Sequence, residues 1–134
     1  MTLEELDHMT VEDLIGVPFK LGARLPGPAV DCYGLVMEVC RRRGIMLPDP
    51  FTSHVRVMQA KDWILTRLTG WRRVEQPAAG VVVELVPGAG VPAHVGVLLD
   101  ARRVLHADPQ AGVIGSDLLR LQEWGLVRGF YVYG

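Results

Sequence analysis

Short apolar runs separated by turn-forming residues dominate the chain from Gly80 onward. Runs of this kind, rich in valine and leucine and bounded by glycine, proline and aspartate, are typical of β-strands. They predict four strands, over residues 81–86, 93–99, 103–107 and 128–133. The intervening turns are expected at 87–92, 100–102 and 108–112, and a short helix is expected over 117–124.

The first half of the chain has a helical pattern instead. Asp31 is a favourable N-cap and Gly44 a favourable C-terminal residue for an amphipathic helix over 32–43. One or two short helices are expected over 2–9 and 10–16, and another helix is expected over about 53–69. A glycine- and proline-rich loop precedes Asp31, over 17–30. Helices first and strands later predict an α+β fold, in which the N-terminal helices pack on a central antiparallel β-sheet.

The turn at 100–102 predicts a hairpin that brings two histidines together. Pairing across it places residue i opposite a residue near 202 − i, so His94 and His106 lie close, and their even separation favours the same face. A histidine base oriented by a second polar residue is what a cysteine nucleophile needs. The alternative is two unrelated histidines, one in the core and one at a solvated strand end.

Cys32 stands at the start of the predicted helix over 32–43. Unpaired backbone N–H groups and the positive end of the helix dipole favour a thiolate there, so Cys32 is a candidate nucleophile. The alternative is a small buried hydrophobic residue. Cys40 lies on the apolar face of the same helix and is expected in the core. Eight helical positions separate the two sulfurs by roughly 12 Å, which is too far for a disulfide.

Composition narrows the class of protein. The 134 residues are 49% hydrophobic, with 14 Lys and Arg against 15 Asp and Glu and a net charge of −1. They predict one domain over 1–134, with 1–15 as an N-terminal helical extension. The near-zero charge argues against a nucleic-acid partner, and no apolar run is long enough for membrane insertion. The acidic first thirteen residues lack the basic start of a secretory signal, so we expect synthesis in the cytoplasm without a signal peptide.

Other kinds of site find little support. The chain has neither a CxxC nor an HxxxH spacing, so we expect no metal, and no glycine-rich phosphate loop is present. His8 and His54 have polar surroundings and are expected at the surface. The three tryptophans are expected in the core or in a groove wall: Trp63, Trp71 and Trp124.

Four segments in this order resemble the NlpC-type cell-wall peptidases of the papain-like superfamily. They are Gly16-Val17-Pro18-Phe19-Lys20-Leu21-Gly22, Asp31-Cys32-Tyr33-Gly34-Leu35-Val36, His94-Val95-Gly96-Val97 and Leu105-His106-Ala107. The resemblance implies a murein endopeptidase that cuts peptidoglycan stem peptides without a metal or other cofactor. It makes Cys32 the nucleophile, His94 the general base and His106 the residue that orients His94. It also implies that Asp31 caps the helix and shapes the entrance, and that the backbone N–H of Cys32 contributes to the oxyanion hole.

One subset of this family consists of small tail proteins of bacteriophages and gene-transfer particles, and the chain is similar to it. Tyr33 stands where cellular members usually have serine, and Leu47-Pro48-Asp49 follows the nucleophile helix. The resemblance implies a virion tail tip as the location and other tail-tip or hub proteins as partners. Two positions depart from the family: Phe19 replaces a tyrosine that helps the oxyanion hole, and Val81 replaces an aspartate. With Asp31 and Tyr33, Phe19 is a candidate substrate-binding or oxyanion residue.

The sequence leaves two other functions open. One is a weak or inactive structural subunit of the tail tip, and the other is an amidase or acyltransferase acting on a non-murein amide. An open groove at Cys32 and a lowered thiol pKa would favour the peptidase, whereas a blocked groove and an ordinary pKa would favour the structural subunit.

Overall fold

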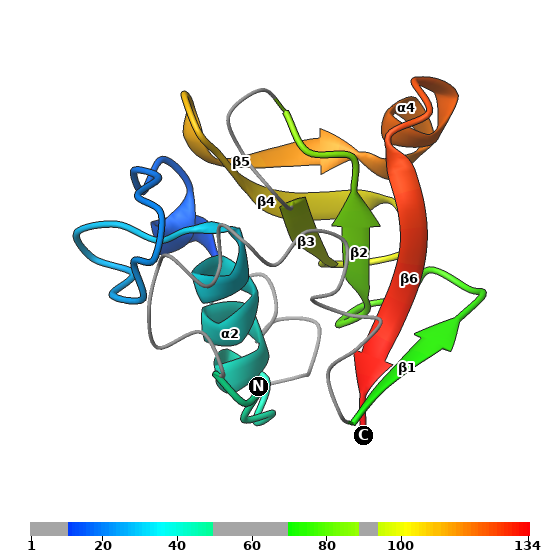
Figure 1. The fold of residues 1–134 in the computed structure, drawn as a ribbon, viewed down its shortest axis with the longest axis horizontal. Coiled ribbons are helices and arrows are strands. Elements are labelled where there is room, and N and C mark those ends of the chain that lie inside the picture. The colour runs from blue at the N-terminus through cyan, green and yellow to red at the C-terminus, as the bar shows by residue number, and fades with distance from the viewer. Residues whose placement is uncertain (1–10, 50–69, 89–93) are drawn as a thin grey trace.

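The computed structural model describes residues 11–49, 70–88 and 94–134. The N-terminal part of this range contributes η1 (Glu12–Leu14) and α2 (Cys32–Arg42). The remainder alternates between strands and one short helix: β1 (Trp71–Val74), β2 (Val82–Leu85), β3 (His94–Leu98), β4 (Arg103–Asp108), β5 (Gly112–Asp117), α4 (Leu118–Glu123) and β6 (Val127–Tyr133). Figure 1 shows α2 lying beside the sheet and α4 at the start of β6, at the end of that strand away from the C-terminus.

Helix α2 begins at the predicted residue because its first turn is capped. The carboxylate of Asp31 accepts a hydrogen bond of 2.7 Å from the backbone N–H of Gly34. Arg41 and Arg42 lie in the last turn, where their charge interacts favourably with the helix dipole. Gly44 then adopts a φ of 86°, which ends the helix in the conformation that glycine tolerates best.

All strands form one antiparallel sheet in the order β1-β6-β2-β3-β4-β5. The predicted register of the β3–β4 hairpin is confirmed, because Gly96 pairs with His106 and Val97 with Leu105. Gly96 is required at this position. A Cβ there would lie 2.8 Å from a Val104 methyl group and 2.9 Å from the Leu105 carbonyl oxygen, closer than packed atoms approach.

Side chains alternate along the strands between two hydrophobic clusters. Val95, Val97 and Leu105 belong to the cluster that contains the buried face of α2. Leu85 and Val104 belong to the second cluster, together with Leu118 and Leu121 of α4. The sheet is therefore covered by α2 on one side and by α4 on the other, and the α+β class with an N-terminal helix on an antiparallel sheet is confirmed.

Of the six strands in the described ranges, four lie where the sequence predicts them, and the sequence pattern did not indicate the other two. The missed strands are β1, where two arginines interrupt the apolar pattern, and β5, whose glycines and serine are poor strand formers. The helix expected over 10–16 is reduced to the single turn η1. The helices expected over 2–9 and 53–69 lie outside the described residues.

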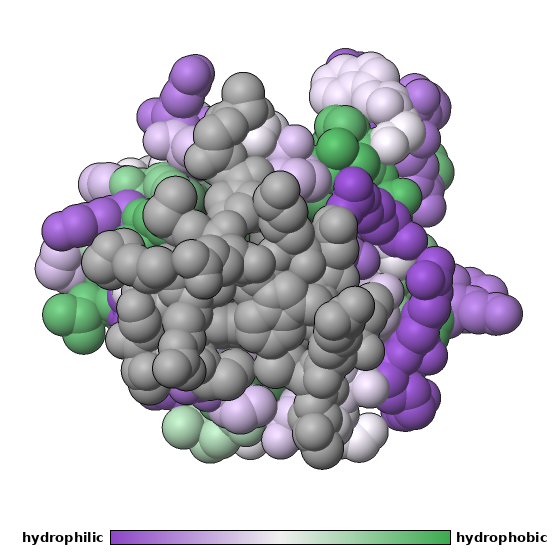
Figure 2. All heavy atoms as spheres, viewed as in Figure 1, coloured by the Kyte–Doolittle hydropathy of each residue, from purple (hydrophilic) through white to green (hydrophobic). Residues whose placement is uncertain are grey.

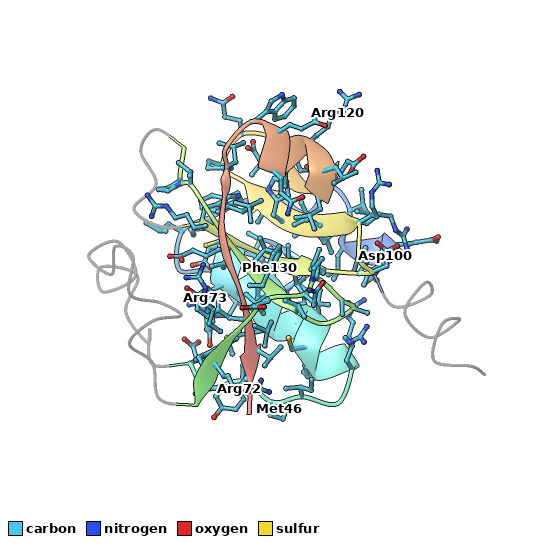
Figure 3. All side chains as sticks on the ribbon, turned by 90° about the vertical axis from the view of Figure 1, so that its right-hand side faces the viewer. Met46, Arg72, Arg73, Asp100, Arg120 and Phe130 are labelled. Atoms are coloured by element: carbon cyan, nitrogen blue, oxygen red, sulfur yellow. The ribbon has the colours of Figure 1, made fainter. Side chains whose placement is uncertain are left out.

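Positive charge is spread over several elements of the described part. Figure 3 shows Arg72 of β1 toward one end of the sheet, Arg73 nearer its middle, and Arg120 of α4 toward the other end. Arg102 pairs with Asp117, and Arg103 with Asp100. Within the described ranges, no helix combines the length and the apolar character that crossing a membrane requires.

Candidate active site

The thiol of Cys32 lies at the junction of α2 and β3. Its side chain is buried, with 2% of the residue exposed, and it takes part in backbone hydrogen bonds with Val95 and Tyr33. Burial raises the pKa of Cys32 to about 12, and the negative charge of Asp31 adds to this effect. The sequence favours a lowered pKa at a helix start, but the loss of hydration outweighs the helix dipole and the two backbone hydrogen bonds. Cys32 is not among the described lining residues of the three cavities next to it in the fold or elsewhere in the described ranges.

His94 and His106 are in direct contact, as the hairpin register predicts. Nε2 of His94 lies 3.0 Å from Nδ1 of His106, and the two rings meet edge to face with centroids 5.2 Å apart. His94 directly precedes Val95, so the histidine pair and the thiol are brought to the same end of β3. The second ring nitrogen of His94, Nδ1, is buried and has no hydrogen-bond partner among the described residues.

Burial keeps both imidazoles neutral. It lowers the pKa of His94 to about 4, and the neighbouring His106 contributes in the same direction. The pKa of His106 is also lowered by burial. Asp108 opposes both shifts through its negative charge. At neutral pH the site therefore contains a protonated thiol and two uncharged imidazoles.

Two polar residues near the histidines were missed at the sequence level. Nε2 of His106 lies 2.8 Å from the hydroxyl oxygen of Ser116 on β5, so the hydrogen-bonded chain continues beyond the pair. Asp108 follows the same register rule as the histidines, since 202 − 94 is 108, and this signal was available in the sequence. Ser116 gave no such signal because its strand was not predicted.

A small cavity opens beside the two imidazoles. Its volume is about 250 Å³, and His94, His106 and Asp108 contribute to its wall. The rest of the lining is mainly apolar and comes from β2 and the segment after it, the β4–β5 turn and the region of α4: Leu85, Val86, Pro87, Gly88, Pro109, Leu121 and Leu126. Figure 2 shows hydrophobic side chains reaching the surface beside α4. A larger cavity of about 780 Å³ lies elsewhere, along η1 and the β3–β4 turn, and neither histidine is among its described lining residues.

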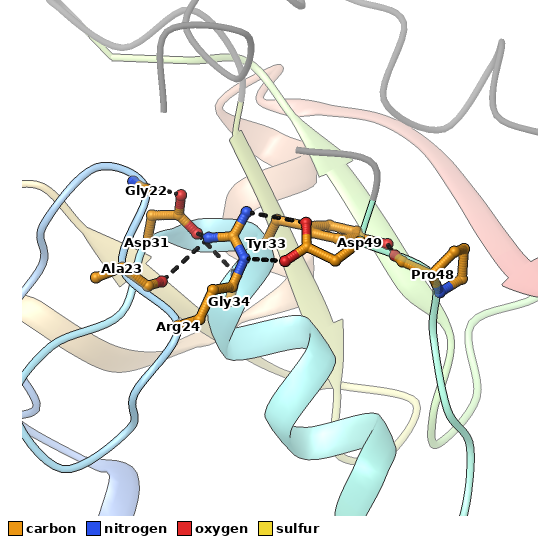
Figure 4. Close-up of polar contacts among 8 residues, drawn as sticks. All are labelled: Gly22, Ala23, Arg24, Asp31, Tyr33, Gly34, Pro48 and Asp49. Atoms are coloured by element: carbon orange, nitrogen blue, oxygen red, sulfur yellow. Dashed lines mark hydrogen bonds and ion pairs between the residues drawn. The ribbon is translucent and has the colours of Figure 1, made fainter. Parts of the chain in front are cut away.

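The loop before Cys32 is held by Arg24 (Figure 4). Its guanidinium donates to the carboxylate of Asp31 at 2.7 Å and to that of Asp49 at 2.9 Å. Asp31 is fully buried and also accepts from the backbone N–H groups of Gly22 and Gly34. The loop, the first turn of α2 and the segment at Asp49 are therefore fixed to one another next to the candidate nucleophile.

The remaining candidate residues make contacts within the protein core and the loop before α2. Tyr33 is fully buried in the core, and its hydroxyl donates to the carbonyl oxygen of Pro48 at 2.6 Å. Asp31 caps α2 as expected, and its carboxylate is fully buried with three hydrogen bonds, from Gly22, Arg24 and Gly34. Phe19 packs against the α2 cluster and forms a parallel bridge with Val30.

The other residues singled out in the sequence divide between core and surface. Cys40 is buried in the core as predicted, and burial raises its pKa to about 11. Trp71 packs edge to face against Tyr133. Trp124 is 64% exposed, so its expected place in the core or a groove wall is wrong. Trp63, His8 and His54 lie outside the described residues. Within the described ranges, no group of three His, Cys, Asp or Glu side chains is arranged to hold a metal ion.

Solved structures share this architecture. The chain is similar to the NlpC/p60 domain of the peptidoglycan hydrolase SagA, with a TM-score of 0.61 and 19% identity over 99% of this chain and 100% of that domain. A Bacillus cereus protein of the NlpC/P60 family gives a TM-score of 0.67 and 16% identity, with 98% of this chain and 40% of that one covered. A Staphylococcus aureus protein similar to lipoproteins of the NLP/P60 family gives 0.57 and 21%, with 96% and 41% covered. The chain thus spans less than half the length of the latter two.

A search of curated protein sequences found no match. The family model described as NlpC/P60 matches residues 16–126, which include α2, the histidine hairpin and most of the sheet. That match covers well over half of the chain. The chain therefore belongs to the NlpC/P60 family.

Proposed function

We propose that the protein is a cysteine peptidase that hydrolyses the peptide stems of bacterial peptidoglycan. The observation that carries the proposal is the 3.0 Å contact between His94 and His106 at the end of β3 where the Cys32 thiol is held. Membership of the NlpC/P60 family and the likeness to a domain of a peptidoglycan hydrolase support this substrate.

In the proposed reaction, Cys32 attacks the carbonyl carbon of the scissile amide while Nδ1 of His94 takes the thiol proton. Nδ1 is the nitrogen available for this task, because Nε2 already contacts His106. Collapse of the tetrahedral intermediate breaks the C–N bond, and His94 returns the proton to the departing amine. Water then attacks the thioester, with His94 as the base, and releases the carboxylic acid and the free thiol.

Burial determines when the proton moves. Because the thiol pKa is raised and the imidazole pKa lowered, the resting pair is neutral and the thiolate is not formed in advance. Proton transfer has to accompany attack on the substrate. The backbone N–H of Cys32 is the proposed oxyanion donor. Phe19 supplies no hydroxyl, and one missing donor lowers the rate by about a hundredfold or more.

A structural subunit of a phage or gene-transfer-particle tail tip is the second candidate. The 2% exposure of Cys32 favours it, since a nucleophile that acts on a polymer must be reached by substrate. A tail-tip location is compatible with both candidates. It is supported by the similarity to the phage subset at Tyr33 and at Leu47-Pro48-Asp49.

Digestion of purified murein sacculi separates the two candidates. Wild type, Cys32→Ala and Cys40→Ala are incubated with sacculi, and released muropeptides are identified by mass. We expect new stem-peptide fragments from wild type and from Cys40→Ala, and none from Cys32→Ala. Absence of product from a folded wild-type protein would contradict the peptidase and favour the structural subunit.

A further inference from the structure

A continuous chain of polar contacts runs across three strands of the sheet. It starts at Nδ1 of His94 on β3, passes through the 3.0 Å contact to His106 on β4, and ends 2.8 Å further at the hydroxyl of Ser116 on β5. Ser116 pairs with Val104, and His106 pairs with Ile114, so Ser116 and His106 project from the same face of the sheet. Ser116 is partly buried, which limits competition from solvent.

The contacts restrict where the ring protons can lie. A neutral imidazole has one N–H donor and one acceptor nitrogen. If Nδ1 of His94 is to accept the thiol proton, the ring proton of His94 must be on Nε2. This N–H then needs an acceptor, which requires an unprotonated Nδ1 on His106. His106 must accordingly hold its proton on Nε2, facing the oxygen of Ser116.

We propose that Ser116 is a positioning residue that fixes the tautomers of both histidines by accepting the Nε2 proton of His106. The catalytic consequence rests on the proposed peptidase function. The tautomer assignment also has a basis of its own, because the buried Nδ1 of His94 has no acceptor among the described residues for a proton placed there, whereas Nε2 faces His106. Without the hydroxyl, a proton on Nε2 of His106 faces no acceptor. The opposite tautomer of His106 directs an N–H at His94, which pushes the proton of His94 onto its reactive nitrogen.

The charged residues around the two histidines do not select the tautomers in place of Ser116. Asp108 is a charged residue of the described ranges whose field reaches both rings, and it stabilises added positive charge without selecting a nitrogen. Its Oδ2 atom is already bound by the backbone N–H groups of Gln110 and Ala111. Asp117, next to Ser116, is engaged by Arg102 and by the N–H of Leu119. Cys32 on α2 is uncharged at neutral pH because burial raises its pKa.

Nitrogen-15 NMR of histidine-labelled protein at pH 7 tests the assignment without a substrate. We expect both rings of the wild type to be neutral and protonated on Nε2. Ser116→Ala should give His106 a mixed or Nδ1-protonated state and change the His94 signals. Ser116→Thr keeps a hydroxyl and should restore the wild-type pattern. Ile114→Val is the matched control, because it changes packing opposite His106 without removing a polar atom.

Murein digestion by the same variants tests the catalytic part. Ser116→Ala should lower kcat/KM by about tenfold with KM little changed, while Ser116→Thr and Ile114→Val stay close to wild type. Wild-type tautomers in a folded Ser116→Ala protein would overturn the proposal. Tautomers that shift as expected in a protein that digests no murein would support the role of Ser116 and refute the peptidase.

Discussion

The buried imidazole of His94 should make the protein lose stability in mild acid. Its pKa falls from the ordinary 6.5 to about 4 in the folded state. Between these values the unfolded chain binds a proton at His94 that the folded protein does not bind, so stability rises with pH and is lost as pH falls. At about 1.36 kcal/mol per pH unit, the whole window corresponds to about 3 kcal/mol. Roughly 2 kcal/mol of this is lost between pH 7 and pH 5.

Urea denaturation followed by circular dichroism at pH 7, 6 and 5 measures the effect. In His94→Gln we expect the free energy of unfolding to fall by about 2 kcal/mol less over this range than in wild type. His106 still makes its own contribution to the pH dependence of stability in this variant, because burial lowers its pKa too. Asp100, Asp108 and Asp117 have lowered pKa values, so their contributions are lost mainly below pH 5.

Val97→Ala is the matched control for this experiment. It removes two methyl groups from a buried position on the same strand, and it should lower stability equally at every pH. A His94→Gln protein with the full wild-type loss between pH 7 and pH 5 would refute the assignment of a neutral buried imidazole.

Three further predictions concern the scaffold and the thiol. Gly96→Ala should lower the free energy of unfolding by about 1–3 kcal/mol, because the added Cβ forces β3 away from β4. Gly27→Ala is the control: nothing lies within 4 Å of its added Cβ, so the free energy of unfolding should change by less than about 0.5 kcal/mol. Thermal or urea denaturation checks both. Arg24→Met should lower the free energy of unfolding by about 3 kcal/mol in the same assay, because it leaves the buried Asp31 carboxylate without its guanidinium. Arg41→Met, which removes an ion pair at the surface, should lower it by less than about 1 kcal/mol. At pH 8 an aromatic disulfide reagent should modify Cys32 much more slowly in native protein than in urea, and equal rates would contradict its burial and raised pKa.

The hairpin could be predicted from sequence because its geometry is local. A three-residue turn and an even spacing determine that His94 and His106 meet, and the observed register agrees. The start of α2 was equally local, since the Asp31 carboxylate caps a helix only three residues away.

The missed features depend on contacts between distant segments. The strand that contains Ser116 is poor in strand-forming residues and is stabilised by pairing along the whole of β4. The pKa of Cys32 depends on burial, which only the packed structure shows. A helix dipole contributes about 0.3–1 kcal/mol, while a thiol pKa raised from 9.0 to about 12 corresponds to roughly 4 kcal/mol, so burial decides the outcome. A large aromatic side chain favours the core or a groove wall, but Trp124 follows a short helix and is 64% exposed.

The place of β6 in the sheet has a consequence for biosynthesis. Every described element precedes β6 along the chain, yet β6 lies between β1 and β2 and pairs with both. Before β6 is synthesised, β1 has no pairing partner among the described strands and β2 has one open edge, although the hairpin with both histidines is already complete. The nascent chain therefore exposes unpaired strand edges until β6 emerges, and this is the stage at which it is most open to aggregation or to capture by a chaperone.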